Sequence, residues 1–218
     1  GQFLGVAEDL GLVAEIDRMI VARTLDDIRA WRAAGLEIAR VSINVSARRL
    51  LDPGLVDHLR ALDIPPGLIA FELLESIYLD EADDMIRWNL DALREMGMPV
   101  ELDDFGSGYA SIISLARLRP DAIKIDRQLV QPITESDEAF ALVRSLVSIA
   151  ATLGVRVTAE GVETEAQIAR LRRAGCDALQ GHILGRPMPA ADFAALLAEL
   201  RDAPAHGALA GGFYGAGI

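Results

Sequence analysis

One stretch of this sequence combines residue types and a spacing that could carry chemistry. A largely apolar run ends at Leu102, the carboxylates Asp103 and Asp104 follow directly, and Gly106 and Gly108 come next. Glycines at such positions permit a sharp turn and a close backbone approach. Adjacent acids repel each other unless a positive charge lies nearby, and a divalent metal ion is an economical partner for them. The alternative is an ordinary turn, because Asp is common in turns and tolerates unusual backbone angles.

The composition narrows the class of protein before any further motif is considered. The chain has 218 residues, 51% of them hydrophobic, and a formal net charge of −12. It is long enough for a substantial core, and its charge argues against binding a nucleic acid polymer through a basic surface. The single cysteine, Cys176, cannot form an internal disulfide, which fits a reducing, cytoplasmic compartment. No apolar run is long enough to span a membrane, although a longer parent protein can be anchored through another segment.

Hydrophobic periodicity predicts strands that alternate with helices. A helix over Leu12–Ala34 is followed by Gly35, a residue typical of helix ends. Connections of this kind, with a helix between successive strands, are typical of parallel β-structure. The predicted strands are Ile38–Val45, Leu68–Leu74, Val100–Asp103, Ala122–Asp126, Val155–Ala159 and Ala178–Ile183, and the later helices are Pro53–Leu62, Glu81–Met96, Tyr109–Leu118, Glu138–Leu153, Glu165–Ala174 and Ala190–Arg201.

A polar residue lies at or near the end of every predicted strand. Side chains placed in this way are typical of the active face of a parallel barrel, whereas an open doubly wound sheet would gather its ligands at one switch point. We therefore expect an α/β fold, a TIM-like (βα) barrel variant. The strand-end residues are Asn44, Glu72, Asp103 with Asp104, Lys124, Glu160 and Gln180.

The predicted strands number six, and a closed barrel of this type has about eight. We expect the remaining pair of strands to lie upstream of Gly1. The barrel domain is expected to cover residues 1–202, and the Gly- and Ala-rich residues 203–218 are expected to form a tail.

With these strand-end residues and their neighbours, the chain resembles the EAL domain family of cyclic di-GMP phosphodiesterases. The resemblance extends in order over nearly the whole chain, to about residue 200, and the family has a (βα) barrel fold. The matching stretches are Phe3 with Ala7-Glu8 and Gly11-Leu12, Ser42–Ser46, Phe71–Ser76, Leu102–Tyr109, Lys124–Asp126, Ala159–Glu163, Gly175–Asp177, Gln180-Gly181 and Arg186-Pro187.

The resemblance implies a role for each strand-end residue. Lys124 and Glu160 match residues at the catalytic water, with Glu160 as general base or as an additional metal ligand. Glu75 matches the acid that braces the loop after Asp104. Positions of the ligand pocket are matched by Glu163, Gln180, Arg186 and Pro187, and divalent-metal ligands by Asn44, Glu72, Asp103, Asp104 and Glu160.

The chemistry of these residues suits that family. Two Mg²⁺ or Mn²⁺ ions can activate water and neutralise phosphoryl oxygens, and carboxylates and an amide oxygen suit such hard ions. A lysine beside them can act as a point cation. Each residue also has an ordinary interpretation: Lys124 as a buried partner for Asp103 or Asp126, Glu72 as part of a solvated strand end, and Gln180 as a turn residue.

The Glu-Ala-Leu motif that names the family is absent from this sequence, and we expect it on one of the upstream strands. The resemblance implies a homodimer and an upstream sensor or GGDEF domain. It also implies hydrolysis of cyclic di-GMP to linear pGpG, with weak activity or none for residues 1–218 alone. The alternatives are a degenerate EAL domain that acts as a cyclic di-GMP receptor, and a barrel that only dimerises.

Overall fold

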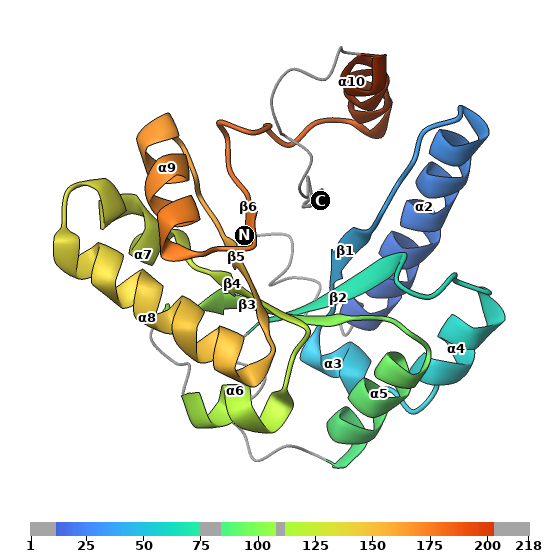
Figure 1. Ribbon diagram of the computed structural model, residues 1–218. Coiled ribbons are helices and arrows are strands. Elements are labelled where there is room, and N and C mark those ends of the chain that lie inside the picture. The colour runs from blue at the N-terminus through green and yellow to red at the C-terminus, as the bar shows by residue number, and fades with distance from the viewer. Residues whose placement is uncertain (1–11, 75–83, 108–111, 203–218) are drawn as a thin grey trace.

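Six parallel strands form one sheet whose spatial order follows the chain order, from β1 to β6. The computed structural model describes residues 12–74, 84–107 and 112–202. Within these ranges the prediction of six parallel strands with crossover helices is confirmed (Figure 1). The strands are β1 (Val41–Asn44), β2 (Ile69–Leu74), β3 (Val100–Phe105), β4 (Ala122–Ile125), β5 (Arg156–Ala159) and β6 (Ala178–Leu179).

The helices lie around the outer side of this curved sheet. Figure 1 shows α2, α4 and α5 beside the first strands, and α6, α8 and α9 beside the later ones. None of the helices in the described ranges has the length and apolar character needed to cross a membrane. The helices are α2 (Val13–Ala33), α3 (Ala47–Leu50), α4 (Leu55–Ala61), α5 (Asp84–Glu95), α6 (Ile112–Leu118), α7 (Arg127–Val130), the 3-10 helix η2 (Gln131–Thr134), α8 (Asp137–Leu153), α9 (Glu165–Ala174) and α10 (Ala190–Asp202).

Local capping residues determine where several helices begin and end. The hydroxyl of Ser136 accepts a hydrogen bond from the backbone N–H of Ala139, 3.0 Å away, at the start of α8. Thr164 and Gln167 form a reciprocal capping box at the start of α9. Gly154 ends α8 with a φ of 73°, a left-handed conformation that glycine adopts without steric cost.

The strands separate apolar residues from polar ones by facing them in opposite directions. Phe71 and Leu73 on β2 are buried in the core, whereas Glu72 between them lies opposite Asn44 of β1 and Glu101 of β3. Because register partners share a face and successive residues alternate, these polar residues line the same face of the sheet.

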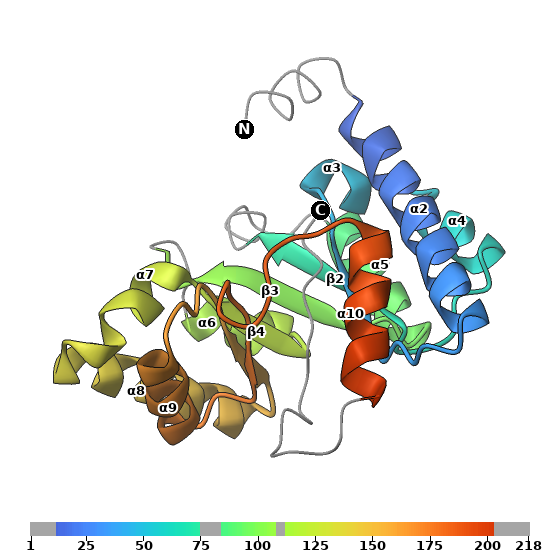
Figure 2. The ribbon, with the colours of Figure 1, turned by 90° about the horizontal axis from the view of Figure 1, so that it is seen from above.

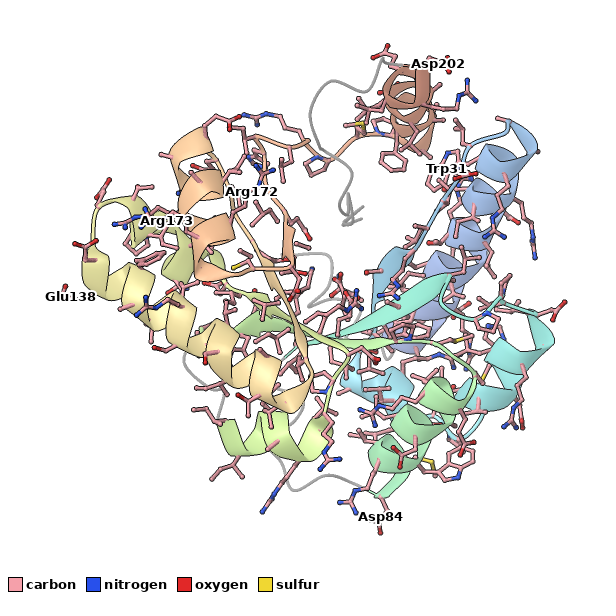
Figure 3. All side chains as sticks on the ribbon, in the orientation of Figure 1. Trp31, Asp84, Glu138, Arg172, Arg173 and Asp202 are labelled. Atoms are coloured by element: carbon pink, nitrogen blue, oxygen red, sulfur yellow. The ribbon has the colours of Figure 1, made fainter. Side chains whose placement is uncertain are left out.

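The last described helix returns to the first. The ring of Trp31 on α2 lies 5.2 Å from the ring of Phe193 on α10, and its indole N–H donates to the carbonyl oxygen of Ala190 over 3.1 Å. Figure 2 shows α10 beside α2, and Figure 3 places Trp31 next to α10. This contact joins the helix that precedes β1 to the helix that follows β6.

The structure differs from the sequence-based expectations in the extent of some elements. Strand β6 ends at Leu179, four residues before the predicted end at Ile183, and β1 begins at Val41 rather than Ile38. The short helices α3, α7 and η2 occupy connections that the sequence pattern left without structure. The predicted N-terminal turns of α5 and α6, at residues 81–83 and 109–111, lie outside the described residues, as do residues 203–218.

Candidate metal centre

A local irregularity in β3 turns two adjacent carboxylates toward the same place. Leu102 lies opposite Ile123 of β4 and Phe105 lies opposite Ile125, so β3 advances by three residues while β4 advances by two. Such an extra residue is a β-bulge, which bends the strand and redirects a side chain. The irregular residue is Asp104, whose φ of 54° departs from the extended backbone of a strand. The bulge therefore brings the carboxylates of Asp103 and Asp104 together, where a regular strand would point them to opposite faces.

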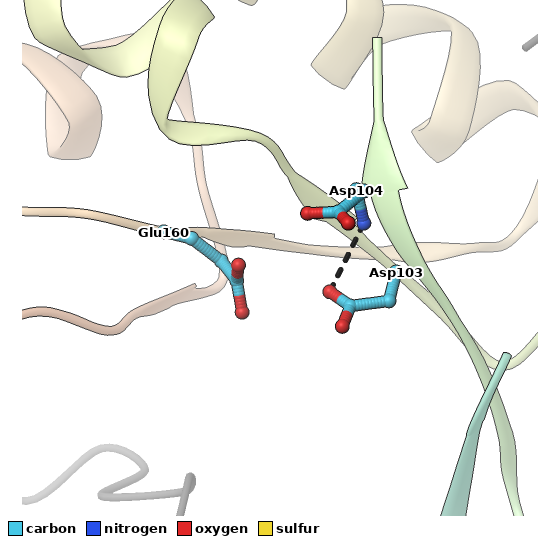
Figure 4. Close-up of side chains that lie close together, drawn as sticks. All are labelled: Asp103, Asp104 and Glu160. Atoms are coloured by element: carbon cyan, nitrogen blue, oxygen red, sulfur yellow. Dashed lines mark hydrogen bonds between the residues drawn. The ribbon is translucent and has the colours of Figure 1, made fainter. Parts of the chain in front are cut away.

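Glu160 completes a group of three carboxylates. It follows β5, and its backbone N–H donates to the carbonyl oxygen of Ile125 over 3.0 Å. One oxygen each of Asp103, Asp104 and Glu160 lies within 4.8 Å of the other two, and the three carboxylates converge in Figure 4. The next residue, Gly161, has a φ of 68°, and a Cβ there would lie 2.4 Å from the Cβ of Arg127. Glycine is therefore required beside Glu160.

Lys124 of β4 lies among these acids. Its ammonium nitrogen is 2.6 Å from Glu160 Oε1, 3.0 Å from Glu72 Oε1 and 3.6 Å from Asp103 Oδ1. Burial by itself lowers the pKa of Lys124, but the charges of the three carboxylates outweigh burial and raise this pKa above 10.5, so the ammonium stays protonated. The pairing of Lys124 with Asp103 that the sequence suggested is present, together with two further partners.

The acids carry more negative charge than one lysine neutralises. Burial raises the pKa of Glu72 and of Glu160, although Lys124 opposes the shift in both. Burial also raises the pKa of Asp104, and the neighbouring charges of Asp103 and Asp126 raise it further. These pKa shifts indicate that the site would gain from additional positive charge.

The donor set fits a hard divalent cation. Its oxygens come from Asp103, Asp104 and Glu160, with Glu72 one strand away and Asn44 opposite Glu72 on β1. Oxygen ligands of this kind suit Mg²⁺ or Mn²⁺ better than soft metals. The geometry thus brings together Glu72, Asp103, Asp104, Lys124 and Glu160 directly, and it places Asn44 at the end of the neighbouring strand.

The other predicted residues lie at different distances from this group. Gln180 follows β6, and its backbone N–H donates to the carbonyl oxygen of Ala159 over 2.8 Å. Its side-chain oxygen is buried and finds no hydrogen-bond partner within the described part of the chain. Glu163, Arg186 and Pro187 are exposed beyond β5 and β6, and Glu75 lies outside the described residues.

Sequence reasoning considered Asp126 only as a possible partner of Lys124, and it did not consider Asp17. Asp126 is buried directly after β4, accepts a hydrogen bond from the backbone N–H of Gln128 over 2.8 Å and starts α7. Asp17 on α2 binds Ser46, just after β1. The position of Asp126 directly after a predicted strand could have indicated its capping role, whereas no local pattern connects Asp17 with residue 46.

Comparisons with known proteins agree with this arrangement. The family model of the EAL domain matches residues 1–187. The bifunctional diguanylate cyclase/cyclic di-GMP phosphodiesterase MucR of Pseudomonas aeruginosa is 38% identical over 202 residues, or 91% of this chain. The chain spans only 29% of that protein's length.

Solved structures show the same fold. A structure titled as the PaMucR phosphodiesterase in complex with c-di-GMP is 36% identical, has a TM-score of 0.79, and covers 88% of this chain and 79% of its own. A manganese/cy-diGMP complex of Klebsiella pneumoniae BlrP1 is 32% identical, has a TM-score of 0.68, and covers 77% of this chain and 43% of its own. The chain belongs to the EAL domain family.

Proposed function

We propose that this domain is a metal-dependent phosphodiesterase that hydrolyses cyclic di-GMP to linear pGpG. The observation that carries the proposal is the convergence of Asp103, Asp104 and Glu160 within 4.8 Å, beside the buried ammonium of Lys124. Relatives named as cyclic di-GMP phosphodiesterases support the choice of substrate. The domain is then one part of a longer signalling protein with an upstream sensor or GGDEF domain.

We assign the metal-binding role to Asn44, Glu72, Asp103, Asp104 and Glu160, with two Mg²⁺ or Mn²⁺ ions per site. Such ions activate water at neutral pH and neutralise phosphoryl charge. The proposed ligands come from β1, β2 and β3 and from the residue that follows β5, so their oxygens reach the site from several strands. The manganese-containing relative supports this assignment.

The reaction adds one water molecule to one phosphodiester bond. A water oxygen bonds to phosphorus, the bond from phosphorus to the ribose O3′ breaks, and a proton passes to that leaving oxygen. In this proposal Glu160 either accepts the proton of the water or binds a metal ion. Lys124, held 2.6 Å from Glu160 Oε1, orients the attacking oxygen or offsets phosphoryl charge. Gln180, Glu163, Arg186 and Pro187 contribute to the nucleotide pocket.

The test is turnover of cyclic di-GMP by the full-length protein in Mg²⁺ or Mn²⁺, with pGpG separated by chromatography. We expect Glu160→Gln to lower kcat by about 10²- to 10⁴-fold, the usual contribution of a positioned proton-transfer group. The matched control is Asp26→Asn, an exposed acid on α2 that pairs with Arg29, which should retain activity. Binding of cyclic di-GMP without product from the wild type would instead make the domain a receptor.

The proposal includes a homodimer formed through α6 and α8, the helices that come after β3 and β4 in the chain. Ile112 and Ile113 on α6 expose 51% and 66% of their surface, and Leu142 on α8 exposes 48%. Apolar side chains that are exposed in this way and are covered on association are typical of interaction surfaces. Ile113→Glu should convert the dimer to monomer in analytical ultracentrifugation, and an unchanged sedimentation coefficient would argue against this face.

A further inference from the structure

The end of β1 is tied to α2 by a buried carboxylate. Oδ2 of Asp17 accepts a hydrogen bond from the hydroxyl of Ser46 at 2.6 Å and another from the backbone N–H of Ser46 at 3.2 Å. Asp17 is only 8% exposed and lies 29 residues before Ser46. Figure 1 shows α2 running beside β1. The two bonds therefore connect an outer helix of the barrel to the end of its first strand.

Asn44 stands two residues before this tie. Between them, the backbone N–H of Val45 donates to the carbonyl oxygen of Glu72 over 2.9 Å. The short segment 44–46 is thus held from β2 through Val45 and from α2 through Ser46. At one end of this segment Asn44 lies in register with Glu72, and at the other end Ser46 is bound by Asp17 of α2.

We propose that Asp17, acting through Ser46, is a positioning residue for Asn44 in the metal centre. The inference rests on the proposed function, because it takes Asn44 as a metal ligand. Mutation of residues that orient the ligands of a metal typically lowers its affinity by about 10- to 100-fold.

Asn44 carries no net charge, and this explains why it depends on such support as a metal ligand. A carboxylate is drawn to a cation by its full charge, whereas a neutral amide oxygen offers only a dipole. Its contribution therefore depends on a backbone that is already in place when the ion arrives. Asp103 and Asp104 obtain their placement from the bulge in β3, and Asn44 obtains it from the tie to α2.

Simple helix packing is a weaker explanation of Asp17. A buried carboxylate is costly to desolvate unless its hydrogen bonds are satisfied, and an apolar residue would pack α2 against the barrel at lower cost. Both hydrogen bonds of Asp17 are directed at one residue. That residue, Ser46, also accepts from the backbone N–H of Arg49 over 3.1 Å and so begins α3. Asp17 therefore orients the residue at which the chain leaves β1.

The test measures Mn²⁺ affinity of the full-length protein by electron paramagnetic resonance, alongside thermal unfolding without metal. We expect Asp17→Ala to weaken Mn²⁺ binding by about tenfold. The matched control is Asp26→Ala, an exposed acid on the same helix that pairs with Arg29, and it should bind Mn²⁺ as the wild type does.

A second pair of variants separates positioning from stability. Ser46→Ala removes the hydroxyl bond and keeps the backbone N–H bond to Asp17, so it should weaken Mn²⁺ binding in the same direction as Asp17→Ala but by less. Ser46→Thr, which keeps the hydroxyl, should restore the affinity. Combining Asp17→Ala with Ser46→Ala should cost no more affinity than Asp17→Ala alone, since Asp17→Ala already removes both hydrogen bonds of the tie. These comparisons use affinities of folded protein, so a loss of stability alone does not produce them.

Two outcomes would overturn the inference in distinguishable ways. If the wild type binds Mn²⁺ and Asp103→Asn does not, while Asp17→Ala binds as tightly as Asp26→Ala, then Asp17 is a packing residue and only the positioning role fails. If the wild type and Asp103→Asn bind Mn²⁺ equally, the metal centre of the proposed function is wrong, and the role of Asp17 fails with it.

Discussion

Two acids on β3, separated by one residue, have contrasting surroundings. Glu101 is 8% exposed; its Oε2 accepts from the hydroxyl of Ser42 at 3.1 Å, and its Oε1 lies 3.5 Å from a guanidinium nitrogen of Arg40. Asp103, on the same face of the strand, instead meets the ammonium of Lys124 at 3.6 Å and two further carboxylates. The first acid has a cation of its own, and the second shares one with other acids.

Other acids at the end of the sheet near Glu101 are also satisfied within the protein. Asp121 accepts from the backbone N–H of Val100 over 2.9 Å, and Asp177 accepts from that of Val157 over 2.7 Å. Each joins the start of one strand to the loop before its neighbour. These acids stabilise the sheet, and their carboxylates already have hydrogen-bond donors, so they need no added cation.

The difference between the two ends is one of charge balance. Glu101, Asp121 and Asp177 each have a donor of their own, whereas Glu72, Asp103 and Glu160 all surround Lys124. In parallel barrels the carboxyl ends carry the chemistry and the other end carries stability. An excess of like charge in a buried place is costly unless a ligand compensates it, and this marks the functional end.

The largest expected effect comes from removing the central cation. Lys124→Met should lower the free energy of unfolding of the metal-free protein by about 3–5 kcal/mol, because it leaves buried carboxylates without their counter-charge. Mn²⁺ should recover part of this loss, since it supplies positive charge to the same acids. Urea unfolding with and without Mn²⁺ measures both quantities. A loss that Mn²⁺ leaves unchanged would contradict the imbalance described here.

The matched change at the other end should behave differently. Glu101→Gln should lower the free energy of unfolding by about 1.5–3 kcal/mol, the range for hydrogen bonds to charged groups. Mn²⁺ should shift the stability of this variant nearly as much as that of the wild type, because the carboxylate of Glu101 is held by Ser42 and Arg40 and acts on the metal centre through its charge beside Glu72. A much weaker response to Mn²⁺ in Glu101→Gln would show that the two ends are strongly coupled.

The smallest effect on stability is expected at His58, whose neighbours include two arginines and one acid, so that positive charge is in excess there. Asp52 forms ion pairs with both Arg18 and Arg49, and His58 Nε2 is buried nearby, without a hydrogen-bond partner in the described ranges. Burial lowers the pKa of His58 below 6.5, and the charges of Arg49 and Arg18 lower it further, while Asp52 opposes them.

Below pH 6.5 the unfolded chain therefore protonates His58 before the folded protein does, and folding loses stability as the pH falls toward the folded pKa. In His58→Gln this part of the pH dependence should disappear. Urea unfolding at about pH 7.5 and pH 5.5 compares the two proteins. If the wild type and His58→Gln lost the same stability between these pH values, the pKa of His58 would not differ between the folded and unfolded states.

Much of this architecture could be predicted from the alternation of apolar runs and helical periods. The prediction of parallel strands with polar residues at their ends is confirmed, because an apolar strand that ends in a polar residue is a local pattern. The short helices α3 and α7 could not be predicted in this way. They begin at Ser46 and Asp126 through single capping contacts, which leave no periodic signal.

The sequence by itself determined which residues are available for the metal centre: acids, an amide and a lysine near the ends of successive strands. The tertiary structure alone decided how they meet. The bulge at Asp104 depends on pairing between β3 and β4, and the bond between Asp17 and Ser46 joins residues 29 positions apart. The physical reason is that spacing along a chain sets which face a side chain occupies, whereas distances between strands and helices arise only when the core packs.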